Sequence, residues 1–205
     1  MALHRLTSVT MGVPNVAETA AYYTDFGLTP DGDGWFTTRD AGRQLHLVHA
    51  PTRRLIELRV GADDPDDLAA AASRLERVGA ACERHGTAVL VLKAPVTYLH
   101  HTSWQVDDVD DVGRGATAML EDHPERHIWG LGRHHAGSNF FWYLKDPAGT
   151  FSEYYSDMDC VADDQLWTPE VLEGAKGLFN WGPPPPPSFL HPEDLAALMS
   201  GSHSD

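Results

Sequence analysis

Glu153 stands in the aromatic stretch FWYLKDPAGTFSEYY (141–155), where the alternation of a strand would place its carboxylate beside large apolar side chains. An ionised carboxylate that is buried without a partner costs several kcal/mol, so an inward-facing Glu153 requires a cation nearby. His101, on an earlier strand-like segment, offers an imidazole. Imidazole and carboxylate donors together suit Fe(II), Mn(II) or Zn(II), so this pair is a candidate metal site. The alternative is that Glu153 lies at a sheet edge in water.

The segment Asp-Pro-Ala-Gly (146–149) predicts a type I turn between two strands, because each residue type fits its place in that turn. With a four-residue loop, Trp142 would face Glu153 across the hairpin. One further loop residue would instead pair Tyr143 with Glu153 and put both on one face. The sequence leaves both registers open, and the metal hypothesis favours Tyr143.

The elements that position these residues repeat along the chain. A strand over 6–13 and a helix over 16–26 are followed by short strands over 34–40 and 43–50. The same order of strand, turn and helix starts again near Arg53 and near Tyr98, which indicates an internal repeat of about 45 to 50 residues. Aligning the three openings places Ser8, Glu57 and His101 at one strand position.

This repetition predicts an α+β fold of βαβββ modules, in which a curled mixed sheet surrounds a metal cavity. We expect partly degenerate modules over 4–95 and a metal-binding module over 96–160. Residues 161–205 are expected to form a proline-rich arm with a short helix near Pro192. Apolar residues flank the proline run 183–187, so the arm is expected to pack on the body or on a second subunit; they are Trp181, Phe189 and Leu190.

The charge of the chain argues against nucleic-acid and membrane partners, because a net charge of −15 repels phosphates and anionic lipids. No long apolar run and no signal-like leader is found, and a cytoplasmic location is the expectation. Cys82 and Cys160 fit simple buried thiols. A sheet edge left open by an incomplete module would favour a homo-oligomer.

The segment YLHHTSWQVDDVDDV (98–112), followed by GLGRHHAGSNFFWYLKDPAGTFSEYYSD (130–157), resembles the last module of the type I extradiol ring-cleaving dioxygenases of the vicinal oxygen chelate superfamily. The resemblance implies that His101 and Glu153 are ligands of Fe(II), with Mn(II) as an alternative. It implies that His134 and Tyr143 touch the substrate. The implied reaction is ring cleavage of a catechol-type aromatic by O2.

Three further residues follow from this resemblance. The stretch ERHGTAVLVLKAPVTYLHH (83–101) resembles the part of the family that carries a catalytic histidine, and His85 is the matching position. His100 is implied to be a neighbour of the site and not a ligand. Arg133 is expected to pair with an acidic group and so orient His134.

The chain departs from the family at the remaining metal ligand. The family takes this ligand from a histidine on the opening strand of the preceding module, where this chain has Ser8 or Glu57. One module is therefore expected to be shortened or missing. The candidates for a third ligand are Glu57, His46, His49, His4 and His85. Glu57 has a second interpretation, as a solvated charge beside Arg59.

Two other functions fit the same residues. One is a glyoxalase-like metal-dependent lyase or isomerase that uses Glu57 as ligand or base. The other is a protein of this fold that binds an aromatic ligand and holds metal weakly or not at all. His123 and His127 fit a surface patch of histidines outside any site.

Overall fold

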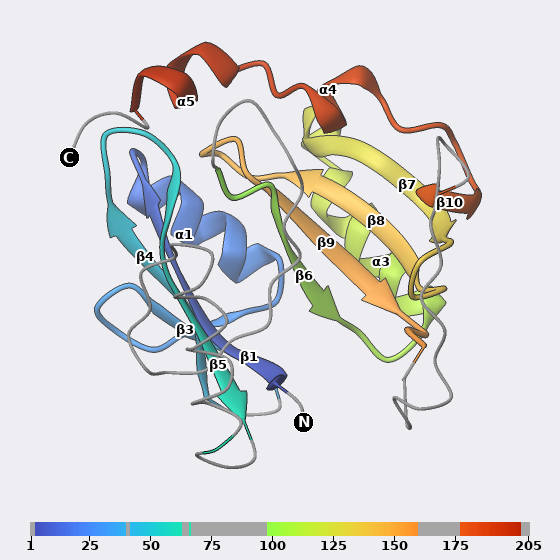
Figure 1. Cartoon of the computed structure of the whole chain (residues 1–205), viewed down its shortest axis with the longest axis horizontal. Coiled ribbons are helices and arrows are strands. Elements are labelled where there is room, and N and C mark those ends of the chain that lie inside the picture. Colours follow the sequence, from blue (N-terminus) through green and yellow to red (C-terminus); the bar gives the residue numbers. More distant parts are fainter. Residues whose placement is uncertain (1–2, 40–41, 63–65, 67–97, 160–176, 202–205) are drawn as a thin grey trace. The chain divides into compact units, whose positions relative to one another are not determined.

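The computed structural model describes residues 3–39, 42–62, 66, 98–159 and 177–201 of the chain (Figure 1). It divides into two compact units. The first unit comprises Met1–Tyr98 and Ala197–Asp205, and the second comprises Leu99–Ala196. Each unit contains a five-stranded mixed sheet. No helix among the described residues is long and apolar enough to cross a membrane.

The first unit has the strand order β2-β3-β4-β1-β5. β1 pairs with β4 in parallel and with β5 in antiparallel orientation. Its helix α1 buries Thr19, Tyr22 and Tyr23, which are spaced to lie on one face. The helix ends at Asp25, one residue before the expected position, and Gly27 follows at φ +107°, a left-handed conformation that glycine adopts without strain. The elements are β1 (Leu3–Val13), α1 (Val16–Asp25), β2 (Thr29–Pro30), β3 (Trp35–Thr37), β4 (Arg43–His49) and β5 (Arg54–Ala62).

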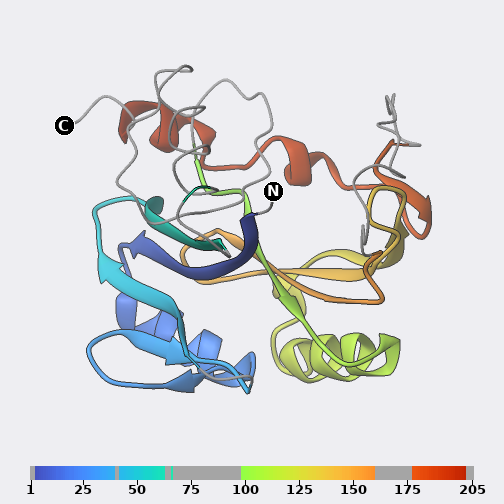
Figure 2. The ribbon, with the colours of Figure 1, turned by 60° about the horizontal axis from the view of Figure 1, so that its bottom comes forward.

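The second unit has the order β10-β7-β8-β9-β6, with β6 parallel to β9. The side chain of Asp108 caps helix α3 by accepting a hydrogen bond of 2.8 Å from the backbone N–H of Asp111. In Figure 2, α3 lies along one face of its sheet. The elements are β6 (His101–Gln105), α3 (Val109–Leu120), the 3₁₀ helix η1 (Pro124–Arg126), β7 (His127–His134), β8 (Phe140–Lys145), β9 (Phe151–Ser156), β10 (Phe179–Trp181) and α4 (Pro187–Leu190).

The two sheets repeat one topology. In each unit a strand is followed by a helix and three strands, and the first strand pairs in parallel with the last. The α+β fold of repeated βαβββ modules is thereby confirmed. Each sheet also gains a fifth strand at one edge, β5 in the first unit and β10 in the second. The helix expected after Asp66 and the apolar strand expected over 87–95 lie outside the described residues.

The hairpin of β8 and β9 has the longer loop. Lys145 pairs with Phe151, so five residues connect the strands, and Tyr143 faces Glu153. The buried Asp146 holds the loop, because its Oδ1 accepts hydrogen bonds of 2.9 Å from the backbone N–H groups of Ala148 and Thr150. The register that pairs Tyr143 with Glu153 is confirmed.

The C-terminal arm, defined here as the described residues 177–196, packs on the sheet of its own unit. β10 extends the sheet beside β7, and Phe189 of α4 is buried in the aromatic core with Trp129 and Tyr143. The indole N–H of Trp129 donates a hydrogen bond of 2.7 Å to the carbonyl of Pro183. The expected packing on the body is confirmed for these residues, whereas β10 and α4 were not expected. The expected short helix is α5 (Leu195–Gly201).

Candidate functional site

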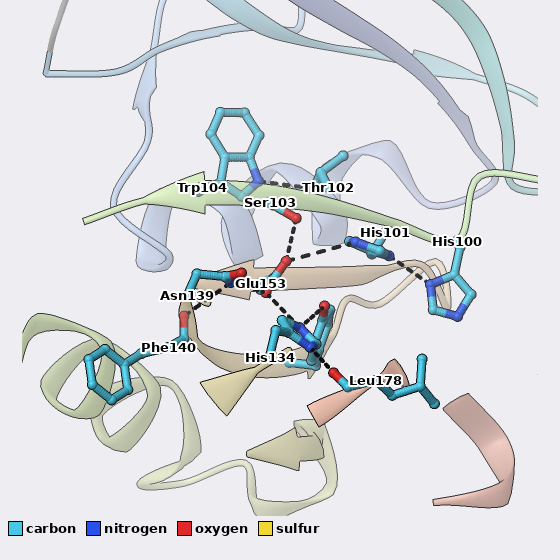
Figure 3. Close-up of polar contacts among 11 residues, drawn as sticks. His100, His101, Thr102, Ser103, Trp104, His134, Asn139, Phe140, Glu153 and Leu178 are labelled. Carbon is cyan, nitrogen blue, oxygen red and sulfur yellow. Dashed lines mark hydrogen bonds and ion pairs between the residues drawn. The ribbon is translucent and has the colours of Figure 1, made fainter. Parts of the chain in front are cut away.

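Four predicted site residues converge on one face of the sheet in the second unit. Parallel pairing of β6 with β9 sets Ser103 beside Glu153, and antiparallel pairing of β9 with β8 sets Glu153 beside Tyr143. His101 lies two residues before Ser103 and therefore on the same face of β6. His134 reaches the group from the end of β7. Figure 3 shows His101 and His134 each facing the Glu153 carboxylate.

Glu153 is buried, with 3% of its surface exposed, so the alternative that it lies in water at a sheet edge is wrong. The hydroxyl of Ser103 donates a short hydrogen bond to its Oε2, and the side-chain amide of Asn139 donates one of 3.4 Å to Oε1. Two histidine nitrogens lie close to the carboxylate: His134 Nε2 is 3.5 Å from Oε1, and His101 Nε2 is 3.8 Å from Oε2. A buried carboxylate with neutral donors and no lysine or arginine in this set suits a bound cation.

His101 is held in the form that binds metal. Burial lowers its pKa from 6.5 to about 4, against the opposing effect of the negative charge on Glu153. The ring is therefore uncharged at neutral pH. Only a neutral imidazole has a lone pair to give to a metal ion, so His101 fits the predicted ligand role in chemical type.

His134 and Tyr143 form a hydrogen-bonded pair. The Nδ1–H of His134 donates to the carbonyl of Leu178 at 2.7 Å, which leaves Nε2 as an acceptor 3.0 Å from the Tyr143 hydroxyl. Burial, reinforced by the charge of Glu153, raises the pKa of Tyr143 well above 10. The tyrosine therefore remains a protonated donor to Nε2 of His134.

Arg133 pairs with an acidic side chain, as the sequence suggested. Its guanidinium lies 2.7 Å from Asp157 Oδ2, donates to the hydroxyl of Ser138 and stacks over the ring of Phe140. These contacts anchor the end of β7 immediately before His134.

The candidates for a third ligand lie in the first unit or outside the described residues. Glu57 forms an ion pair of 3.0 Å with Arg59 and is about 39% exposed, as expected for a solvated charge. His46 stacks on Trp35 at 4.2 Å, and its Nε2 lies 3.1 Å from the carbonyl of Asp33. His49 is exposed, and His4 lies on β1 where only the backbone is described. His85 lies outside the described residues.

The second unit supplies two of the predicted metal donors, His101 and Glu153. Among the residues that the structure describes, no group of three or more His, Cys, Asp or Glu side chains is arranged to hold a metal ion. His101 and Glu153 fit a metal in donor type, and a complete ligand set requires a further donor.

Sequence reasoning missed several groups that position the site. Asn139 stands just before β8 and contacts Glu153, but an asparagine at a strand start gives no distinct signal. Two backbone carbonyls of the arm, at Leu178 and Phe189, hydrogen-bond to His134 and His100. Backbone carbonyls occur at every residue, so only the tertiary structure could identify these two.

Comparison with known proteins identifies a family model and two curated relatives that match this chain. The family model described as the Glyoxalase/Bleomycin resistance protein/Dioxygenase superfamily matches residues 5–154. Metapyrocatechase 2 of Cupriavidus necator is 38% identical over 100 residues, which cover 49% of this chain and 31% of that protein. The manganese-dependent 2,3-dihydroxybiphenyl 1,2-dioxygenase of Geobacillus genomosp. 3 is 34% identical over 89 residues, which cover 42% of this chain and 28% of that protein.

These matches thus span less than a third of each curated relative. Among solved structures, the Mn(II)-bound glyoxalase from Novosphingobium aromaticivorans superposes with a TM-score of 0.72 at 20% identity. That superposition covers 93% of this chain and 95% of the other. The structural match supports the fold assignment.

Proposed function

Because this chain belongs to the Glyoxalase/Bleomycin resistance protein/Dioxygenase superfamily, we propose that it takes part in extradiol ring cleavage of a catechol-type aromatic by O2. The observation that carries the proposal is the buried Glu153 carboxylate, which faces the Nε2 atoms of two histidines and contacts no lysine or arginine among the described residues. One curated relative is named as a metapyrocatechase and another as a 2,3-dihydroxybiphenyl 1,2-dioxygenase, and these names support the choice of reaction.

The proposed metal ligands in the second unit are His101 and Glu153. The metal is Fe(II) or Mn(II), since imidazole and carboxylate suit both ions and one relative is named as manganese-dependent. When bound, such an ion lowers the pKa of the catechol hydroxyls and provides the redox contact that O2 chemistry requires. Glu57, His46, His49, His4 and His85 stay the candidates that the sequence offers for a third donor.

The proposed acid–base groups are His134, Tyr143 and His85. Nε2 of His134, whose ring is oriented by the Leu178 carbonyl, would accept the proton that a substrate hydroxyl loses. The Tyr143 hydroxyl keeps its proton and would donate a hydrogen bond to a substrate oxygen. We assign His85 to proton transfer from its matching position in the family, unless it supplies the third ligand.

The test is ring cleavage by protein purified without O2 and then loaded with Fe(II) or Mn(II). With catechol or 2,3-dihydroxybiphenyl, we expect O2 uptake and the appearance of a yellow ring-cleavage product. Glu153→Gln should lose both signals. Glu125→Gln, which changes a carboxylate that is 70% exposed in the same unit, should keep them.

Metal-loaded, folded protein that consumes no O2 with these catechols would refute the proposal. Binding of the aromatic compounds by that protein would then point to a ligand-binding role.

A further inference from the structure

The ring of His100 connects the C-terminal arm to His101. Its Nε2 lies 2.5 Å from the backbone carbonyl of Phe189, and its Nδ1 lies 2.7 Å from Nδ1 of His101. The contact between the two histidines is drawn in Figure 3. His100 thus has a hydrogen-bonding partner at each ring nitrogen.

Hydrogen-bond chemistry allows one arrangement of protons when both rings are uncharged. A carbonyl oxygen only accepts, so Nε2 of His100 must carry a proton. A neutral imidazole has a single N–H, which leaves Nδ1 of His100 as an acceptor. Nδ1 of His101 must therefore donate to it, and the lone pair of His101 is left on Nε2, the atom that faces Glu153.

The arm carbonyl that starts this chain of bonds is fixed in place by packing. Phe189 is buried against Trp129 and Tyr143, with ring centroids 4.8 Å away in both cases. The His100 ring lies edge-on to Phe151 and Phe189. The same segment supplies the Leu178 carbonyl that orients His134 directly, so arm carbonyls govern the proton positions of both histidines that face Glu153.

We propose that the C-terminal arm, acting through His100, is a positioning element that keeps Nε2 of His101 unprotonated and thereby sets the affinity of the site for a divalent metal. This inference rests on the proposed function for its metal site. Without His100, the buried Nδ1–H of His101 would lose its acceptor. The tautomer with the proton on Nε2 would then be the more stable one, because its N–H can donate to Glu153. A proton on Nε2 blocks metal binding at that atom.

The test uses Mn(II) alone and three variants. His100→Phe keeps a ring between Phe151 and Phe189 and removes both hydrogen bonds. His100→Gln offers an amide N–H for the Phe189 carbonyl and an amide oxygen for His101. It therefore restores both hydrogen bonds of His100, which together are called the relay below. His127→Phe is the matched control, because His127 is an exposed histidine that also lies edge-on to an aromatic ring, that of Trp142.

Calorimetric titration should show Mn(II) affinity reduced roughly 10- to 100-fold in His100→Phe, the range found when partners of metal-ligating histidines are removed. His100→Gln and His127→Phe should bind like the wild type. Ring-nitrogen NMR of the metal-free wild type at neutral pH should find the His101 proton on Nδ1, and His100→Phe should shift it toward Nε2.

The outcomes separate this inference from the proposed function. A His101 proton on Nε2 in the wild type, or unchanged Mn(II) affinity in folded His100→Phe, would overturn the relay. Weakened Mn(II) binding in His100→Phe without any ring cleavage by the wild type would uphold the relay and refute the proposed reaction. A wild type that binds neither Mn(II) nor Fe(II) would refute both.

Discussion

Burial of the ionised Glu153 carboxylate is electrostatically unfavourable, and its neighbours offset this only in part. Its carboxylate is buried, and its hydrogen-bond donors, Ser103 and Asn139, are neutral. Neutral donors replace only part of the hydration that an ionised carboxylate loses on burial. We therefore propose that the charge at this position serves to bind a cation and not to stabilise the fold.

Glu153→Gln should separate these two contributions. The amide keeps the shape of the side chain and removes the charge, so the metal-free protein should be equally stable or more stable, by up to about 1 kcal/mol. Mn(II) affinity should fall by at least roughly tenfold, as the charged donor is lost. Urea unfolding and calorimetric titration measure the two effects. A variant that loses stability without metal, and keeps its Mn(II) affinity, would contradict this role for the carboxylate.

His101 should make the stability of the metal-free protein sensitive to acid. Its pKa is about 4 in the folded chain, whereas the unfolded chain has the ordinary value of 6.5. Between pH 4 and pH 6.5 the unfolded state therefore binds a proton that the folded state does not. Stability should therefore fall as the pH drops from 6.5 to 4, by at most about 3 kcal/mol, and this contribution should level off below pH 4.

Urea unfolding across this pH window measures the effect. His101→Asn should flatten the curve, whereas His123→Gln, at a histidine side chain that is 51% exposed, should leave it unchanged. A curve for His101→Asn as steep as that of the wild type would show that other groups cause the acid sensitivity.

The hairpin of β8 and β9 is the element that decides which side chains meet. Its five-residue loop pairs Tyr143 with Glu153, whereas a four-residue loop would have put Trp142 opposite the carboxylate. A shift of one residue in a strand turns each side chain to the other face. The loop length thus determines whether the tyrosine hydroxyl belongs to the site.

Asp146→Ala should test how the loop is maintained. It removes the acceptor of two backbone N–H groups, so we expect a loss of roughly 2 kcal/mol in the free energy of unfolding and weaker Mn(II) binding. Asp122→Ala, at an exposed aspartate after α3, should change stability by less than about 0.5 kcal/mol. Wild-type stability in Asp146→Ala would show that the strands alone fix the register.

At the scale of the whole molecule, the two units repeat one topology with different chemistry. In the second unit one row across the strands is Ser103, Glu153 and Tyr143. When Ser8 is aligned with His101, the corresponding row of the first unit is Thr10, His46 and Trp35. His46 takes the place of the carboxylate and stacks on Trp35. The first unit thus keeps the framework and lacks the acidic donor at this position.

This difference predicts one Mn(II) ion per chain. His46→Phe should leave Mn(II) affinity unchanged, because the histidine nitrogen is engaged by the carbonyl of Asp33 and the ring stacking can be retained. Metal analysis after gel filtration gives the stoichiometry, and Glu153→Gln serves as the variant that loses the ion. Two ions per chain would show that the first unit holds a metal ion of its own, and loss of binding in His46→Phe would show that His46 is a metal donor.

The sequence by itself determined the repeated modules and the residues of the candidate site. Strand periodicity, helix turns and the spacing of Ser8, Glu57 and His101 are local patterns. Such patterns can be recognised without knowledge of the fold. The resemblance in residues 98–157 added the roles proposed for His101, His134, Tyr143 and Glu153.

Only the tertiary structure decided the hairpin register, the burial of Glu153 and the placement of the arm. The register depends on a single loop residue, and burial depends on strands that are distant in sequence. The bonds from the Leu178 and Phe189 carbonyls depend on backbone atoms that are the same at every position of a chain. A sequence records which side chains are present, and packing selects which backbone groups meet them.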